Sequence, residues 1–472
     1  MGRQPRQPRQ EAGKRGEDRG RHQEEEWKDF PMFLPFRMSL PENHCNHIVK
    51  RVKMIDNDNK DSSSRVAVRV DRIKTTERMA SMKVLIVPMF ARATTSGPWS
   101  RALAISKALD DAGHEILMGV ATDGNCDPPA GMATFQIPAP SPLGLPSFLS
   151  RNMLPALSKL GVVGKVRIKS FEEVLHFAGA LDYRYICDSV EPIRKAIRRF
   201  SPDAIYSEVN ISAILAARIE GVPVFGSSSY TTRKAYASAP KYASGVRRFI
   251  SEFSLPPINS SLELFDWLER KFIPSTPSLE PVDDPNVVYC GFMKKPVDFD
   301  ERQRKDLILV YMGNGSVSSK KLEKTLTEVF SDSDYSGYKV IVAGSKGKKR
   351  IGNIFFEKRA EFSRLFPRTK VFINHGGQNS MMDGISYCVP QIVFPSKAFE
   401  RNFNAQSLER VGAGINLSAK GLNPDSLHEA LSAIESNEAY YKDNARSLRE
   451  ELISLGCTDT IIRTMLDVLD RA

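Results

Sequence analysis

The stretch from residue 371 to residue 415 constrains the fold more than any other part of the chain. A short apolar run, Val371 to Ile373, is followed by two adjacent glycines and a polar turn that leads into a helix start. Glycines between a strand end and a helix N-terminus let backbone N–H groups approach a ligand closely, and the helix dipole adds a positive end suited to phosphate. The pattern predicts an anion-binding turn comprising His375, Gly376, Gly377, Gln378, Asn379 and Ser380.

A second apolar run, Val389 to Pro395, leads to the polar residues Glu400, Arg401 and Asn404. Taken alone, a glycine pair is usually an ordinary turn, and an acidic–basic pair is usually a solvated helix start. Here both follow predicted strands of one strand–helix–strand unit, and ligands of open α/β sheets bind outside the carboxyl ends of the strands. The order and spacing therefore favour a binding site.

These residues resemble the nucleotide-sugar donor motif of the family 1 glycosyltransferases, in particular the bacterial macrolide and antibiotic branch. The shared pattern is HGGxxSxxDxI, a Val-Pro pair, ERxxNA and GAG. The resemblance extends over residues 82–455 and is most specific between 371 and 415. It implies an α/β protein of the GT-B fold, in which two Rossmann-like parallel-sheet domains face each other across a cleft.

The resemblance also implies roles for individual donor-site residues. His375 is expected to contact the donor diphosphate, while the turn from Gly376 to Ser380 holds the phosphates with its amides and polar side chains. Asp383 occupies the position of an acid that binds the ribose. Glu400 and Arg401 occupy the position of a pair that binds the sugar, with Asn404 beside them. Gly315 and Ser316, in a glycine-rich turn that opens the second domain, are expected to face the diphosphate as well.

The residue that deprotonates the acceptor is the difficulty, because Pro98 stands where the family usually carries a general-base histidine. Glu208 ends a predicted strand and matches the acid that pairs with that histidine, so it is our candidate for the base. Asp123, at the end of the second predicted strand, is the alternative. Trp99 and Arg101 are expected to line the acceptor or phosphate side of the cleft.

Alternating strand and helix patterns predict the domain organisation. They separate residues 82–290 and 291–455 as two domains. The resemblance implies that the first domain binds the acceptor and the second the donor, and that a helix at 456–472 returns to the first. We also predict one long helix over 167–199 and a substrate-facing loop over 138–165. Residues 1–81 are polar without periodicity, so they are predicted to be a disordered extension, with Met82 as the working start.

Composition excludes several classes of protein. The six cysteines lie far apart without a CxxC pair, so neither a metal site nor a disulfide framework is expected. No apolar segment approaches the length of a transmembrane helix or a signal core, which predicts a cytoplasmic protein. The net charge of +11 suits an anionic substrate or peripheral membrane contact, whereas nothing in its pattern indicates nucleic-acid binding.

The resemblance therefore implies a glycosyltransferase that moves a sugar from a nucleotide diphosphate to a hydroxyl of a lipophilic small molecule or lipid. The donor is expected to be a UDP-sugar, with dTDP as the alternative base, and no further cofactor is required. The reaction is expected to invert the anomeric centre without a metal. Two alternatives remain open: a nucleotide-sugar epimerase of the same fold, and a non-catalytic nucleotide-sugar binder.

Overall fold

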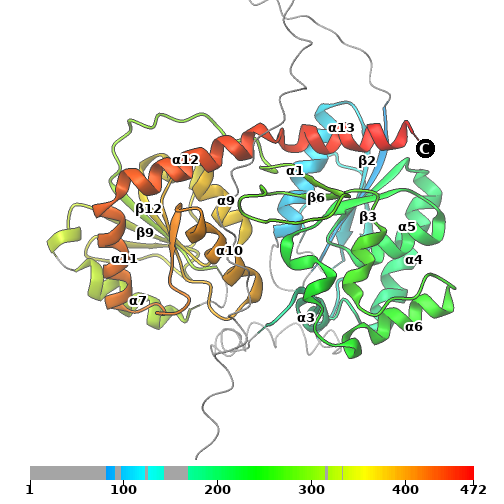
Figure 1. Cartoon of the computed structure of the whole chain (residues 1–472), viewed down its shortest axis with the longest axis horizontal. Helices are drawn as coiled ribbons and strands as arrows, with labels where there is room; N and C mark the ends of the chain where they lie inside the picture. The colour runs from blue at the N-terminus through cyan, green and yellow to red at the C-terminus, as the bar shows by residue number, and fades with distance from the viewer. Residues whose placement is uncertain are drawn as a thin grey trace, which may run out of the picture. The chain divides into compact units, whose positions relative to one another are not determined.

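The computed structural model describes residues 81–90, 97–122, 126–142, 168–313, 317–331 and 333–471. Within these residues the chain forms two seven-stranded sheets flanked by helices (Figure 1). This architecture confirms the predicted α/β fold of two Rossmann-like domains. Apart from Ser81, the predicted extension lies outside the described residues, and so does most of the predicted loop over 138–165.

The first sheet has the strand order β3-β2-β1-β4-β5-β6-β7, and all of its neighbouring strands are parallel. Its strands are β1 (Lys83–Pro88), β2 (Glu115–Ala121), β3 (Thr134–Ile137), β4 (Ala204–Glu208), β5 (Val224–Ser227), β6 (Lys271–Ile273) and β7 (Val287–Tyr289). The α-helices that accompany it are α1 (Gly97–Asp111), α3 (Phe171–Ala178), α4 (Tyr183–Phe200), α5 (Ile211–Glu220) and α6 (Ser244–Glu252).

The second sheet has the order β10-β11-β9-β8-β12-β13-β14 and is parallel except for the β10–β11 pair at its edge. Its strands are β8 (Leu307–Tyr311), β9 (Lys339–Ala343), β10 (Lys349–Ile351), β11 (Ile354–Glu357), β12 (Thr369–Asn374), β13 (Gln391–Val393) and β14 (Gly414–Asn416). The α-helices that follow β8 are α7 (Ser319–Phe330), α8 (Phe362–Leu365), α9 (Gln378–Ser386), α10 (Phe399–Arg410), α11 (Pro424–Ser436), α12 (Glu438–Ser454) and α13 (Cys457–Leu469).

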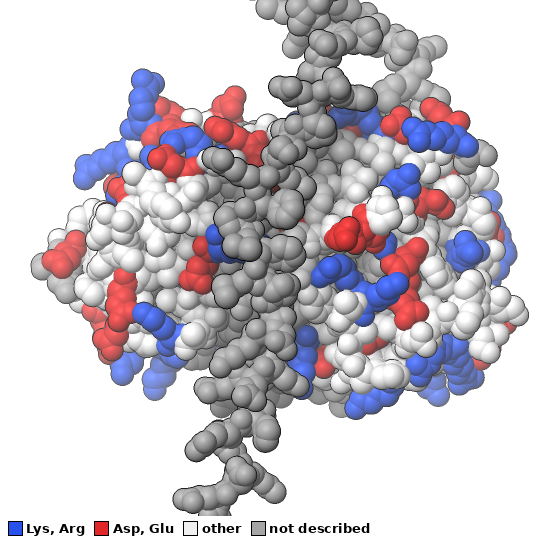
Figure 2. Space-filling model, in the orientation of Figure 1, with Lys and Arg blue, Asp and Glu red and all other residues white. Residues whose placement is uncertain are grey.

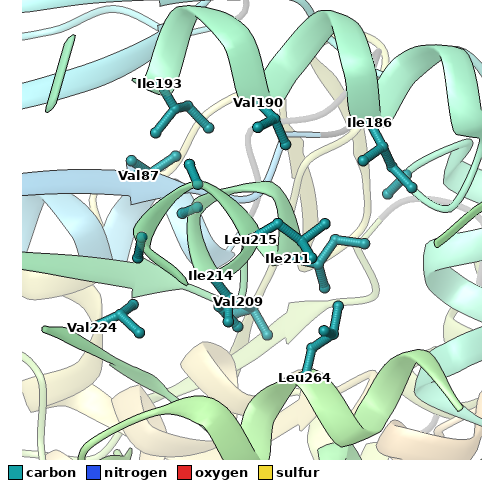
Figure 3. Close-up of a cluster of buried hydrophobic side chains, with 14 of the residues drawn as sticks. Val87, Ile186, Val190, Ile193, Val209, Ile211, Ile214, Leu215, Val224 and Leu264 are labelled. Atoms are coloured by element: carbon teal, nitrogen blue, oxygen red, sulfur yellow. The ribbon is translucent and has the colours of Figure 1, made fainter. Parts of the chain in front are cut away.

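Apolar side chains between helices and sheet hold the first domain together. Ile186, Val190 and Ile193 follow one another at helical spacing on α4, and they pack with α5 and with strand residues such as Val87 and Val224 (Figure 3). Residues 211–217 of α5 are all buried, as expected for a helix enclosed by its neighbours. Each such side chain contributes about 1.5–3 kcal/mol on burial, so this cluster fixes the strands whose ends form the cleft.

The predicted long helix over 167–199 is wrong, because the structure has two helices, α3 and α4. The break is at Gly179, which has a left-handed φ of 82° and ends α3. A Cβ at this position would lie 1.9 Å from the carbonyl oxygen of Ser141. Glycine is therefore needed both for the backbone turn and for the close approach, and the chain resumes a helix after the N-cap of Asp182.

The C-terminal helix α13 packs against α1 of the first domain, whereas α12 packs against α9 of the second (Figure 1). Ile461, Met465 and Leu466 of α13 join the buried cluster that contains Ala102 and Ile105 of α1. The chain thus passes between the domains twice, first after β7 and again at Gly456 between α12 and α13.

Charged side chains of both signs are interspersed over the face shown in Figure 2. Close ion pairs occur in both domains, for example Arg194 with Glu220 at 2.6 Å and Lys349 with Glu323 at 2.6 Å. In the part of this face that the described residues form, the positive side chains are not gathered into one patch. In the part of the chain that the structure describes, no helix combines the length and the apolar character needed to span a bilayer.

Candidate functional site

Buried amide side chains on the side away from the cavity hold the turn between β12 and α9 in place. Asn374 accepts a hydrogen bond from the Gly376 amide at 2.8 Å and donates to Gln391 at 2.7 Å. Asn404 donates to the Gly376 carbonyl at 2.8 Å. Gly376 has φ of 77°, and a Cβ there would meet the Arg401 carbonyl oxygen at 2.9 Å. These bonds preorganise the turn, and they place Asn404 beneath it rather than on the cavity wall.

The N-terminus of α9 is left open by the protein. Gly377 is its N-cap residue and supplies no side-chain hydrogen bond, and the first turn contains no acidic residue. The first N–H groups of a helix have no intrahelical partner, and the dipole is positive there. Gln378, Asn379 and Ser380 line the adjoining cavity, so these groups are available to an anion.

His375 lies at the carboxyl end of β12 with only 9% of its surface exposed. Its ring packs edge-to-face on Tyr311, with 5.5 Å between centroids, and its Nδ1 has no hydrogen-bond partner among the described residues. Burial, followed by the nearby Arg401 charge, lowers the pKa of His375 to about 4. The imidazole is therefore neutral at physiological pH, with one ring nitrogen able to donate to a ligand oxygen.

A cavity of about 570 Å³ lies between the two domains above this turn. Its donor-side wall includes Tyr311, Gly313, Phe362, His375, Gly377, Gln378, Asn379, Ser380, Asp383, Glu400 and Arg401. Its opposite wall, from the first domain, includes Met89, Arg101, Phe171, Val174, Val209, Ser228, Ser229, Thr231 and Thr232. Most of the predicted donor-site residues thus reach one cavity, although they come from two separate segments.

The ionisable groups on the donor side differ in their environments. Loss of surrounding water raises the pKa of Asp383 to about 6, an effect that the Lys294 charge opposes. Burial lowers the pKa of Arg401, which the Glu400 carboxylate opposes. Asp383 also lines a smaller neighbouring cavity of about 230 Å³ beside the connection that contains Lys294.

Glu208 is at the end of β4 as predicted, yet its side chain is completely buried. One carboxylate oxygen accepts from Nε of Arg101 at 2.7 Å, and the other accepts a hydrogen bond from the Ser227 hydroxyl. Burial raises the pKa of Glu208, while Arg101 opposes the rise. Because Arg101 stands between this carboxylate and the cavity, the structure does not present Glu208 to an acceptor as a base.

The two residues that we expected on the acceptor side have different environments. Arg101 lines the cavity. Trp99 was wrongly placed there, because its side chain is 7% exposed and belongs to the core of the first domain. Trp99, Ala102, Ile105 and Leu109 recur at helical spacing on the buried face of α1, which turns Trp99 inward. Asp123, Gly315 and Ser316 lie outside the described residues, so their predicted roles stay predictions.

Several cavity residues were missed by sequence reasoning. Phe362 packs edge-to-face on Tyr311 with centroids 5.5 Å apart, so the cavity wall has an aromatic pair. Thr231 and Thr232 follow β5, whose carboxyl end faces the same cavity. Their position after a parallel strand was the available signal.

Glu280 was also missed, because it precedes β7 in a connection with no strand or helix pattern of its own. It accepts hydrogen bonds from the Tyr230 amide at 2.7 Å and from Gln378 Nε2 at 3.3 Å. Burial raises the pKa of Glu280 to about 7. A residue of the first domain thus contacts the donor turn.

Aromatic stacking also joins the two domains near the cavity. The Tyr230 ring stacks on Phe403 of α10 with centroids 4.2 Å apart and an interplanar angle of 8°. The Arg233 guanidinium lies 3.7 Å from the centroid of the Tyr230 ring, on the first-domain side. These contacts fix the relation of α10, which carries Glu400 and Arg401, to the opposite wall.

Comparisons with known proteins agree with this geometry. Residues 349–468 match the family model described as erythromycin biosynthesis protein CIII-like, C-terminal domain. An uncharacterized UDP-glucosyltransferase of Bacillus subtilis, YdhE, is 28% identical over 148 residues, which are 30% of this chain and 37% of that protein. The NDP-glycosyltransferase YjiC of the same organism is 26% identical over 150 residues, or 30% and 36% of the two chains. Each match thus spans less than two-fifths of the relative's length.

A solved structure matches over a longer range. SsfS6, a Streptomyces sp. SF2575 glycosyltransferase complexed with thymidine diphosphate, superposes with a TM-score of 0.54 at 19% identity, covering 83% of this chain and 100% of that one. Two Rossmann-like sheets that share a cavity at their carboxyl edges define a protein of the GT-B fold. Within that class, residues 349–468 are similar to the erythromycin biosynthesis protein CIII-like family, and the donor motif resembles that of the antibiotic-type family 1 glycosyltransferases.

Proposed function

We propose that the protein transfers a sugar from a nucleotide diphosphate to a hydroxyl group of a lipophilic acceptor. The observation that carries this proposal is the convergence of three features on one cavity of about 570 Å³. These are the uncapped N-terminus of α9, the neutral side chain of His375 and an opposite wall supplied by the other domain.

On the donor side, the leaving diphosphate would lie against the first turn of α9. The helix amides, His375 and Arg401 would hold its oxygens, and they are already in place before charge develops on the leaving group. Asp383 would accept hydrogen bonds from the ribose hydroxyls, and Glu400 would accept them from the sugar. This arrangement supports a nucleotide-sugar donor, of which a UDP- or dTDP-sugar is our choice, because it offers groups for the diphosphate, the ribose and the sugar.

On the acceptor side, the wall combines apolar and hydroxyl-bearing residues. Met89, Phe171 and Val174 would pack on an apolar acceptor, while Ser229 and Thr231 would orient its hydroxyl. The acceptor oxygen would attack the anomeric carbon as the bond from that carbon to the β-phosphate oxygen breaks. The proton of the acceptor hydroxyl passes to the leaving diphosphate, whose β-phosphate oxygen is freed by the same step. A single displacement of this kind inverts the anomeric centre.

The proposal is tested first by nucleotide binding to the full chain. Thermal stabilisation by UDP, dTDP and GDP is compared between the wild type and His375→Ala. We expect one diphosphate to stabilise the wild type and to lose most of that effect in the variant. The absence of stabilisation by every nucleotide would contradict the donor site.

Turnover is then tested with the glucose derivative of whichever nucleotide binds and a panel of phenolic, steroid and lipid alcohols. Release of the nucleoside diphosphate that depends on the acceptor is the expected result. NMR of the glycoside is expected to show inversion relative to the donor. Binding without any acceptor-dependent release would instead indicate a non-catalytic nucleotide-sugar binder.

A further inference from the structure

Arg101 belongs to the acceptor-side domain but reaches the donor turn of the other domain. Its Nη1 donates to Gln378 Oε1 at 3.3 Å, and a Cβ on Gly97 would be 3.2 Å from Nη1 and 3.5 Å from the Asn379 side-chain amide. Gln378 and Asn379 are the first residues of α9. The guanidinium of one domain therefore lies against the positive end of a helix in the other.

The bonds that hold Arg101 in this place are unequal. Nε and Nη2 both contact Glu208 Oε1 at 2.7 Å, whereas the bond from Nη1 to Gln378 is long at 3.3 Å. A guanidinium carries five N–H donors, and two strong contacts on one side leave donor capacity on the other. That other side faces the cavity and the donor turn.

Charges around the guanidinium explain why an anion would be stabilised there. Arg101, Arg401 and the α9 N-terminus are positive. Glu208 neutralises Arg101 from behind, and Glu400 and Glu280 are the further acids whose charges reach this region. The uncapped start of α9 and the free donor side of the Arg101 guanidinium both attract a negative charge, so an anion at the donor turn would be stabilised by both.

We propose that Arg101 binds the β-phosphate of the donor from the acceptor-side domain, and that Glu208 and Ser227 act as positioning residues that aim it. This inference rests on the proposed function, since it assigns an additional contact to the same diphosphate. Glu208, predicted from sequence to be the base, thereby acts through Arg101. Both domains would then bind the diphosphate. Its release would require Arg101 and the N-terminus of α9 to move apart.

The test compares nucleoside diphosphate with monophosphate, because only the diphosphate carries the β-phosphate. Calorimetric titration of the full chain with UDP and UMP, or dTDP and dTMP if that base binds, is carried out for wild type, Arg101→Gln and Arg101→Lys. We expect Arg101→Gln to weaken diphosphate binding by about 10- to 100-fold and monophosphate binding by less than about threefold. Arg101→Lys retains the charge and is expected to lose less than Arg101→Gln.

Two further variants separate positioning from general damage. Glu208→Gln keeps the shape but removes the anchoring charge, so the diphosphate preference is expected to fall between wild type and Arg101→Gln. Arg302→Gln is the matched control, because the Arg302 side chain is 93% exposed and its Nε pairs with Asp300 at 3.2 Å. It is expected to bind both nucleotides like the wild type.

The outcomes that overturn the inference are distinct from failure of the proposed function. An unchanged ratio of diphosphate to monophosphate affinity in a folded Arg101→Gln variant overturns the role of Arg101 alone. Loss of transfer only to phenolate or carboxylate acceptors, with diphosphate binding intact, overturns it in favour of an acceptor contact. If Arg101→Gln does not fold, an unchanged ratio in Arg101→Lys and Glu208→Gln has the same meaning. If no nucleotide binds the wild type, both proposals fall.

Discussion

The two domains each have a helix, α5 or α9, directly after a strand that ends at the cavity. The N-terminus of α5 is capped by a side chain, whereas that of α9 is open to a ligand. β4 pairs with β1, the first strand of its domain, and β12 pairs in the same way with β8, the first strand of the other domain. The helices α5 and α9 follow β4 and β12. The Asn210 side chain caps α5 by accepting from the Ala213 amide at 3.1 Å, whereas Gly377 gives α9 no side-chain cap. A Rossmann-like unit therefore becomes an anion site when its own residues leave the helix N–H groups unpaired.

The turn before α5 and the turn before α9 also differ in which residue adopts a positive φ. Val209 precedes Asn210 with φ of 58°, an unfavourable conformation for a β-branched residue, and the Asn210 side chain also donates to the Pro88 carbonyl at 2.9 Å. In the second domain, the positive φ falls on Gly376, which adopts it at little cost. The Asn210 side chain of the first turn is used in hydrogen bonds within the domain, whereas the start of α9 in the second turn has no side-chain cap and adjoins the cavity.

Gly377→Asp is expected to have the largest effect, because it gives α9 the kind of cap that α5 has. The new carboxylate would occupy the helix amides and repel a diphosphate, and its Cβ would stand 2.7 Å from His375 Nε2, so the ring must move. We expect UDP or dTDP affinity, measured calorimetrically, to fall by at least about 1,000-fold. Gly377→Ala separates the Cβ contact from the carboxylate, and equal losses in both variants would argue against capping as the cause.

The buried His375 is expected to make stability depend on pH. Its pKa is about 4 in the folded protein, against an ordinary value of 6.5. Between these values the unfolded chain binds a proton that the folded chain excludes. The free energy of unfolding should therefore fall as the pH drops from 6.5 to 4, by up to about 3 kcal/mol.

Urea unfolding at several pH values measures this dependence, and His375→Gln is expected to flatten it. His114 provides the matched change in the first domain, because burial lowers its pKa too, though by less. If the pH dependence of the free energy of unfolding persists in His375→Gln but disappears in His114→Gln, then His114 of the first domain causes it and the prediction for His375 is wrong.

Asn210→Ala tests the comparison in the first domain, because it removes the side-chain cap of α5 and leaves that helix uncapped like α9. We expect the free energy of unfolding to fall by about 1–2 kcal/mol, because the Ala213 amide and the Pro88 carbonyl lose a partner. Nucleotide affinity should stay within about twofold of wild type. A large loss of affinity would mean that the capped turn of the first domain also contacts the nucleotide.

Gln378→Ala is expected to have the smallest effect. The side chain bridges Arg101 to Glu280 and to the Pro274 carbonyl, but each of these bonds is 3.2 or 3.3 Å long. Their removal should weaken diphosphate affinity only a fewfold, by less than about 1 kcal/mol. A loss above tenfold in the same titration would show that Gln378 contacts the nucleotide rather than the opposite domain.

The fold and the donor turn could be predicted because their signals are local. The run from Val371 to Ser380 sets a strand, two glycines and a helix start in direct succession, and the structure reproduces that order. The break at Gly179 was also visible as a glycine, but helical periodicity on both sides outweighed it. Trp99 could have been placed in the core from its spacing to Ala102 and Ile105.

The environments of Glu208 and Arg101 could not be predicted in the same way. Both lie near the ends of elements that face the cavity, so position alone assigns each of them to the wall. Which one reaches it depends on how a long side chain from α1 crosses β4 and on Ser227 in β5, and that depends on packing between elements distant in sequence. Glu280 shows the same limit, because its contact with Gln378 joins residues of different domains.

The return of α13 to the first domain makes that domain discontinuous along the gene. A chimera that exchanges acceptor specificity by swapping the segment up to β7 alone would pair a foreign α1 with the native Ile461 and Met465. A chimera should therefore exchange residues 457–469 together with the N-terminal segment. Its two junctions then lie where the chain passes between the domains, after β7 and at Gly456.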